Sequence, residues 1–330
     1  MNMQLLEKIL TAYGPSGHEG RVAETIREAL DGHVDEMRTD VMGNLIAVRH
    51  GNGTGKRIML AAHMDHIGLA VIDADKHGYL RVCSVGGIDA ETMVSGHVVF
   101  ENGVCGVVFS DEKAEGKLKV SDLYVDIGAQ TREEALDRVS VGDMCVMKPR
   151  VTRLGGHRLA SPAMDDRISC YIQAQALLEL NGQTKNEIIA VFSVQEEVGA
   201  AGATTAAYGA EPDMGIAIDV TGTGDVPEVK TKLAVTLGKG AAIKIMDRSV
   251  ICTPSVVELM ERLAAENGIP TQREVLPFGG TDAEPIQKSR GGVATGAISV
   301  PCRYIHSEAE TVDLRDVQAC VDLLKACLKA

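Results

Sequence analysis

The sequence predicts an α/β fold into which a smaller β-rich domain is inserted. Apolar runs rich in β-branched residues, typical of buried strands, alternate with helical patterns before residue 67 and after residue 157. Between these positions, short alternating runs separated by Gly and Asp turns indicate a small barrel or sandwich. The 330 residues are enough for two domains. We therefore expect residues 1–66 and 158–330 to form one discontinuous α/β domain around an inserted domain, 67–157.

The first part of the α/β domain is expected to contain two helices and two strands. Helical spacing of apolar residues predicts helices at 3–13 and 18–31, separated by a Gly-Pro-Ser-Gly break. Strand-like apolar runs follow at 44–48 and 57–62. The second run leads directly into three polar residues: His63, Asp65 and His66.

The α/β pattern returns after the insertion with a helix expected at 168–180, just after Asp165 and Asp166. The apolar run 187–194 is the clearest buried strand, and it leads into the adjacent pair Glu196 and Glu197. The elements expected after it are a helix at 200–208, a strand at 214–221, a helix at 254–267 ending at a Gly cap, a strand at 293–300 and a last helix at 313–328.

Composition excludes several classes of function. The net charge of −13, the absence of Trp and the 3% aromatic content argue against binding to nucleic acid. The eight Cys residues form no C-x-x-C pair, which argues against a structural zinc knot and favours reduced thiols in the cytoplasm. There is no signal-peptide pattern and no apolar run of membrane-spanning length. We expect no nucleic acid and no membrane as partners.

Residues that can bind metals follow several of the expected strands. Ligands of open α/β sheets bind outside the carboxyl ends of strands, and imidazole with carboxylate suits zinc, cobalt or manganese. Each residue alone has an ordinary explanation; Asp165, for example, could cap a helix. Together they are numerous enough for two metals that share a bridging carboxylate. The set is His63, Asp65, Asp165, Asp166, Glu196, Glu197, Asp219 and His306.

These residues lie in short motifs that occur together and in a fixed order. The motifs are His63-Met-Asp65-His-Ile-Gly68, Met164-Asp165-Asp166-Arg167, Val194-Gln-Glu196-Glu197-Val-Gly199, Ala217-Ile-Asp219-Val-Thr221, Gly279-Gly-Thr-Asp282-Ala and Tyr304-Ile-His306-Ser307. The ordered set resembles the tetrahedral aminopeptidase family, whose members are cocatalytic dinuclear metallopeptidases such as glutamyl and leucyl aminopeptidases. The resemblance covers essentially the whole chain.

The resemblance implies a fold, an assembly and a role for each residue. It implies a zinc-exopeptidase-like central mixed sheet flanked by helices, with a small PDZ-like β-barrel that pairs subunits into dimers, six of which form a dodecamer. Two divalent ions per subunit are implied, with zinc first and cobalt able to substitute. The implied ligands are His63 and Asp219 for one ion and Glu197 and His306 for the other, with Asp165 bridging; the adjacent Asp166 is the alternative bridge. Glu196 would be the general base, Asp65 would orient a ligand, and His66 receives no role.

The expected function is removal of N-terminal residues, one at a time, from short peptides. The resemblance implies that a metal-activated bridging water attacks the peptide bond while Glu196 accepts its proton. Two alternatives stay open: a metal-dependent deacylase or amidohydrolase on the same fold, and a non-enzymatic peptide-binding protein. Residues 236–249 look most like leucyl-type members and favour neutral aliphatic first residues, although acidic and basic preferences, the native metal and the physiological peptides stay open.

Overall fold

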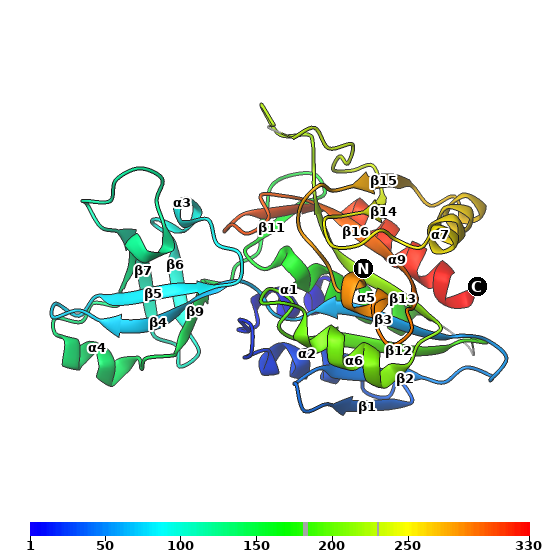
Figure 1. Cartoon of the computed structure of the whole chain (residues 1–330), viewed down its shortest axis with the longest axis horizontal. Helices are drawn as coiled ribbons and strands as arrows, with labels where there is room; N and C mark the ends of the chain where they lie inside the picture. The colour runs from blue at the N-terminus through cyan, green and yellow to red at the C-terminus, as the bar shows by residue number, and fades with distance from the viewer. Residues whose placement is uncertain (181–183, 230) are drawn as a thin grey trace.

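The computed structural model describes residues 1–180, 184–229 and 231–330. A larger α/β unit lies beside a smaller closed β-barrel, and the two are clearly separate bodies in Figure 1. The predicted combination of a mixed, helix-flanked sheet and an inserted barrel is therefore confirmed.

Four parallel strands form the centre of the large sheet. Their order is β12, β3, β13 and β16, and each neighbouring pair is parallel. The carboxyl ends of all four strands consequently lie at one edge of the sheet, which is where ligand-type residues were expected. The bounds are β3 (Arg57–His63), β12 (Glu187–Ser193), β13 (Met214–Gly222) and β16 (Ala294–Arg303).

Antiparallel strands extend this centre on both sides and make the sheet mixed. On one side β2 pairs with β12, and β1 pairs with β2; on the other side β17, β11 and β10 follow β16. Strand β14 pairs antiparallel with β16 and carries β15. These strands are β1 (Glu36–Thr39), β2 (Leu45–Arg49), β10 (Thr152–Arg153), β11 (Arg158–Ser161), β14 (Ala241–Met246), β15 (Thr271–Val275) and β17 (Glu310–Asp313).

Helices cover both faces of the sheet because side chains alternate between the faces along each strand. In β3, Ile58, Leu60 and Ala62 pack into the larger core cluster, whereas Met59 and Ala61 pack into the smaller one. The larger cluster is covered by α1 (Met3–Thr11), α2 (Gly20–Leu30), α5 (Met164–Glu179), α7 (Pro254–Asn267) and α9 (Leu314–Lys329). The smaller cluster is covered by α6 (Ala201–Ala210) and α8 (Ala283–Gln287).

Helix α5 connects the N-terminal helices to the edge of the sheet. The Arg167 side chain in its first turn is fully buried. Its guanidinium donates hydrogen bonds to the carbonyl oxygens of Ile9, Ala12 and Gly14, at 2.9–3.0 Å. The carbonyls of Ile9 and Ala12 are at the C-terminal end of α1, where backbone carbonyls lack partners within the helix. They accept hydrogen bonds from the buried guanidinium of Arg167. The contact holds the connection between α1 and α2 against the start of α5.

The smaller body is a closed barrel of six strands that encloses its own apolar core. The barrel, rather than the sandwich, is the form that the inserted sequence adopts. Its strands are β4 (Gly68–Ala74), β5 (Leu80–Val85), β6 (His97–Phe100), β7 (Cys105–Ser110), β8 (Leu123–Asp126) and β9 (Met144–Met147). Between them lie α3 (Ala90–Met93), the short 3-10 helix Val120–Asp122 and α4 (Arg132–Arg138). The division of the chain at 66/67 and 157/158 stays a prediction.

Within the described ranges, no helix combines the length and the apolar character needed to cross a membrane.

Candidate active site

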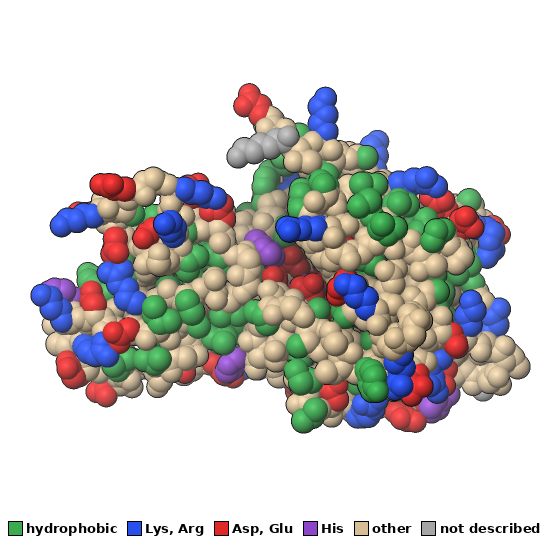
Figure 2. Space-filling view, in the orientation of Figure 1, with side chains coloured by type: hydrophobic (Ala, Val, Ile, Leu, Met, Phe, Trp, Pro, Cys, Tyr) green, Lys and Arg blue, Asp and Glu red, His purple; other side chains and the backbone are tan. Residues whose placement is uncertain are grey.

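A hollow lies between the barrel and the α/β unit, and acidic side chains gather in it together with a histidine (Figure 2). The carboxyl ends of the four central strands deliver residues to this edge of the sheet. His63 is the last residue of β3, Glu196 and Glu197 follow β12, and Asp219 lies near the end of β13. His306 follows β16. The strand ends thus bring together most of the residues that the sequence analysis collected, and the start of α5 adds Asp165 and Asp166.

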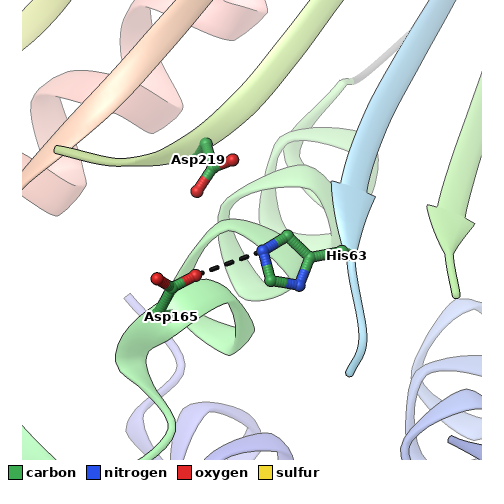
Figure 3. Close-up of side chains that lie close together, drawn as sticks. All are labelled: His63, Asp165 and Asp219. Carbon is green, nitrogen blue, oxygen red and sulfur yellow. Dashed lines mark ion pairs between the residues drawn. The ribbon is translucent and has the colours of Figure 1, made fainter. Parts of the chain in front are cut away.

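His63, Asp165 and Asp219 form a first group of potential metal ligands. One ligand atom from each residue lies within 4.8 Å of the others. Figure 3 shows the three side chains converging from β3, the start of α5 and β13. Nε2 of His63 lies 3.1 Å from Oδ1 of Asp165. The other ring nitrogen, Nδ1, lies 3.0 Å from the carbonyl oxygen of Asp65, which leaves Nε2 facing the two carboxylates.

Asp165, Glu197 and His306 form a second group with the same spacing. Nε2 of His306 lies 3.3 Å from Oδ2 of Asp165 and 3.1 Å from Oε1 of Glu197. Asp165 therefore belongs to both groups and turns one oxygen toward each histidine. Asp166 is oriented differently, since its Oδ2 accepts a hydrogen bond from the backbone N–H of His63. The geometry places Asp165 between the two groups.

Asp65 holds the turn that carries the two glutamates. Its carboxylate accepts hydrogen bonds from the backbone N–H groups of Glu196, at 3.0 Å, and Glu197, at 3.2 Å. It also accepts one from the Ser16 hydroxyl, at 2.6 Å, and it lies 3.5 Å from Nδ1 of His63. One buried carboxylate therefore positions the His63 ring and the turn after β12 together.

Glu196 is partly buried and belongs to neither ligand group. Its Oε2 lies 3.8 Å from Nε2 of His63. Within the described residues its carboxylate accepts no hydrogen bond, while its neighbour Glu197 points toward His306. The adjacent glutamates therefore point in different directions, as a ligand and a proton acceptor would require.

Burial and mutual repulsion dominate the electrostatics of the site. Burial raises the pKa of Asp166, Asp219, Glu196 and Glu197. Burial also opposes the charge of Asp165, but hydrogen bonding to His306 and His63 holds its pKa well below its ordinary range.

The two histidines respond to the same carboxylates. Burial disfavours the charged imidazole of His306, but Asp165 and Glu197 overcome this effect and raise its pKa to about 11. Burial is likewise overcome at His63, whose pKa is raised by Asp165 and Asp65. Without another cation, protons on the imidazoles offset part of the negative charge.

The donor set fits divalent cations. Imidazole nitrogen and carboxylate oxygen are the ligands that zinc and related metals take, and a cation would replace the protons that otherwise offset the buried charge. Oε1 of Glu197 is buried and, among the described residues, has no hydrogen-bond partner, although it lies 3.1 Å from Nε2 of His306. A cation bound by both atoms would give Oε1 of Glu197 the partner that it lacks.

Four residues that support the site were given no role from the sequence. Glu310 on β17 accepts hydrogen bonds from the backbone N–H groups of Asp165, at 2.9 Å, and His306, at 2.7 Å. Ser16 contacts Asp65, and Glu19 accepts a hydrogen bond from the N–H of Gln195 at 3.1 Å. Asp282, which lies in one of the motifs, accepts a hydrogen bond from Ser193 at the end of β12. Only Asp282 had a sequence signal, its Gly-Gly-Thr-Asp motif.

Comparison with known proteins assigns the family. The model of the M42 glutamyl aminopeptidase family matches residues 43–323. The chain belongs to this family. The resemblance to tetrahedral aminopeptidases that the motifs indicated is confirmed, and the protein is an aminopeptidase, a hydrolase of peptide bonds.

Three relatives illustrate the similarity. A lysyl aminopeptidase of Pyrococcus furiosus is 38% identical over an alignment of length 343, which covers 100% of this chain and 97% of the relative. The structure of an aminopeptidase from Desulfurococcus kamchatkensis has a TM-score of 0.95 and 38% identity, covering 99% of this chain and 94% of that one. The TET1 peptidase of Pyrococcus horikoshii has a TM-score of 0.89 and 35% identity, covering 99% and 98%.

The raised pKa of His306 predicts how the stability of metal-free protein depends on pH. A group whose folded pKa is raised from 6.5 to about 11 stabilises the fold fully below pH 6.5, and this contribution is lost as the pH rises toward 11. We expect the melting temperature of chelator-treated protein to fall between pH 7 and pH 9.5, and to fall less steeply in His306→Gln. Differential scanning calorimetry of both proteins measures this. His77→Gln, at an exposed barrel histidine, is the control. Equal slopes for wild type and His306→Gln would contradict the prediction.

Proposed function

We propose that this aminopeptidase uses two divalent cations to remove N-terminal residues one at a time from short peptides. The observation that carries the proposal is the position of Asp165, whose two oxygens face His63 and His306 and join the two ligand groups. In this proposal His63 and Asp219 hold one cation, Glu197 and His306 hold the other, and Asp165 contacts both. Zinc is the first choice, and cobalt is an alternative with the same ligand preference.

When bound, the cations would supply two effects: a lower pKa for the attacking water and polarisation of the scissile carbonyl. Glu196 accepts the proton of the attacking water on its carboxylate and then delivers it to the nitrogen of the leaving peptide. Its environment supports this role, since burial raises the pKa of Glu196 and its carboxylate therefore takes up a proton more readily than an exposed one. Asp65 keeps Glu196 in place through the hydrogen bond to its backbone N–H.

Exopeptidase action distinguishes this proposal from a deacylase on the same fold. A free α-amine is a cation or a metal ligand, and the hollow that would receive it is lined by carboxylates. A deacylase would instead accept a substrate whose amine is already acylated. The aminopeptidase relatives favour exopeptidase action over deacylation.

The Glu196→Gln variant tests the division of roles between the two glutamates. The amide keeps the shape of the side chain but cannot accept a proton, so we expect turnover to fall roughly 10²-fold or more. Elemental analysis should still find two divalent ions per chain, and Glu197→Gln is the matched variant that should lose one. If Glu196→Gln loses an ion and Glu197→Gln does not, the two roles are interchanged. Fewer than two ions in active wild type would contradict the dinuclear site.

Substrates with and without a free N-terminus test the reaction class. We expect stepwise cleavage of a short peptide, followed by mass spectrometry, and resistance of its N-acetylated form. Cleavage of the acetylated peptide alone would support the deacylase instead. A panel of aminoacyl chromogenic substrates tests the first-residue preference, for which residues 236–249 favour leucine; faster lysyl or glutamyl cleavage would contradict that preference and leave the mechanism intact.

We also propose that the chain assembles through the barrel into dimers and that six dimers form a dodecamer in the cytoplasm. The assembly is supported by the TET1 peptidase of Pyrococcus horikoshii, which can assemble into a tetrahedron or a large octahedral shell. The location is supported by the described cysteines, which are all free thiols, as expected in a reducing compartment. Light scattering on metal-loaded protein should give about twelve times the chain mass of 35.0 kDa. A dimer that persists with metal bound would contradict the dodecamer.

A further inference from the structure

A segment of the inserted barrel contacts two residues of the second ligand group. Gly86 and Gly87 directly follow β5. A Cβ atom added to Gly87 would lie 3.1 Å from Nδ1 and 3.2 Å from Cε1 of His306. A Cβ added to Gly86 would lie 3.1 Å from Cβ and 3.2 Å from Oε2 of Glu197. The barrel backbone therefore packs directly against both side chains, so closely that a Cβ atom at either position would press on them.

The loop that carries His306 needs support from its surroundings. Tyr304 and His306 both have left-handed backbone conformations, with φ of 61° and 62°. Residues with a side chain adopt this conformation at a cost, so contacts elsewhere must hold them there. Glu310 supplies one such contact from the α/β unit by accepting a hydrogen bond from the N–H of His306.

Ile305 also packs against the core of the α/β unit, and further contacts to this loop come from the inserted region. The hydroxyl of Thr92, in α3, donates to the carbonyl oxygen of Asp89 at 2.8 Å and also lies 3.4 Å from the carbonyl oxygen of His306. Arg150, in the return from the barrel, forms an ion pair with Glu308 at 2.6 Å. Gly96 packs against the same glutamate, since a Cβ there would lie 2.8 Å from its Oε1. The His306 loop is thus held between the α/β unit and the barrel.

The first ligand group is supported differently. Apart from Asp165, the described residues whose hydrogen bonds or ion pairs hold His63 from outside its strand are Asp65, Asp166, Cys170 and Glu196, all in the α/β unit. The Asp219 carboxylate accepts a hydrogen bond from its neighbour Val220 on β13. Within the described parts of the chain, no hydrogen bond or ion pair joins residues 68–150 to either side chain.

From this asymmetry we propose that the inserted barrel positions the ligands of one metal site and leaves the other to the α/β unit. Gly86, Gly87 and the contacts to the 304–308 loop set where His306 and Glu197 point. They thereby set the affinity with which His306 and Glu197 bind their cation. Residues that orient ligands change metal affinity roughly 10–100-fold when they are altered. The inference rests on the dinuclear site of the proposed function.

Gly87→Ala tests the inference with little disturbance to the backbone. Gly87 is not among the residues with positive φ, so alanine fits its conformation, while the new methyl group must displace the His306 ring by a few tenths of an ångström. Metal-free protein is titrated with Zn²⁺ in a calorimeter at pH 7.5. We expect two sites in the wild type, and in Gly87→Ala one unchanged site and one weakened roughly tenfold or more. Gly209→Ala, where a Cβ meets nothing, is the matched control.

A second variant tests the same support without a new atom at the site. Arg150→Met removes the ion pair to Glu308, and we expect it to weaken the same site by a smaller factor. Arg153→Met, at an exposed arginine for which no ion pair is found among the described residues, is its control. Thermal unfolding and light scattering of each variant, at one protein concentration, show whether fold and assembly are retained.

The outcomes separate the inference from the function on which it rests. Two unaltered sites in Gly87→Ala overturn the inference alone, and so does an equal loss at both sites. Fewer than two Zn²⁺ sites in the wild type overturn the dinuclear proposal, and the inference falls with it. Selective loss of one site in Gly87→Ala, with Gly209→Ala unchanged, supports the inference.

Discussion

The site depends on the placement of Asp165, because this one carboxylate relates two sets of ligands that come from different strands. It lies at the start of α5, a helix whose side chains from Met164 to Leu177 are all buried. Packing of α5 against β3 and β13 therefore decides the distance from Asp165 to His63 and Asp219. The backbone N–H of Asp165 and that of His306 bind the same Glu310 side chain. A shift of α5 relative to the sheet would consequently change both ligand groups at once.

Charge sets the second constraint on this arrangement. A protein interior does not tolerate several carboxylates in one place unless protons, cations or hydrogen bonds offset their charge. The raised pKa values of Asp166, Asp219, Glu196 and Glu197 express this conflict in the metal-free chain. Part of the net charge of −13 thus has a local explanation, since acids concentrated in one hollow are the form that a cation site takes. In a protein that binds no cation, the same buried acids would lower the stability of the fold.

Sequence reasoning succeeded where local pattern decides structure and failed where tertiary packing does. Helix α2 was predicted from the spacing of Val22, Ile26 and Leu30, and all three are fully buried. Strand β1 was missed because it is polar and largely exposed, and β15 because it is polar; neither has an apolar alternation to mark it. The barrel could not be told from a sandwich, because closure depends on β9 pairing with both β4 and β6, which are distant in sequence. The ligand-type residues were found because parallel strands gather their carboxyl ends.

The supporting residues escaped for a different physical reason. Glu310 and Glu19 act by accepting hydrogen bonds from backbone N–H groups, and any residue can offer such a group, so no motif marks the pair. Gly86 and Gly87 act through the absence of a side chain, which lets the barrel backbone approach two ligands closely. A search for residues that can do chemistry passes over such positions. The insertion contains none of the potential metal ligands. It still affects the site, because the residues packed against a ligand side chain decide how that side chain is oriented.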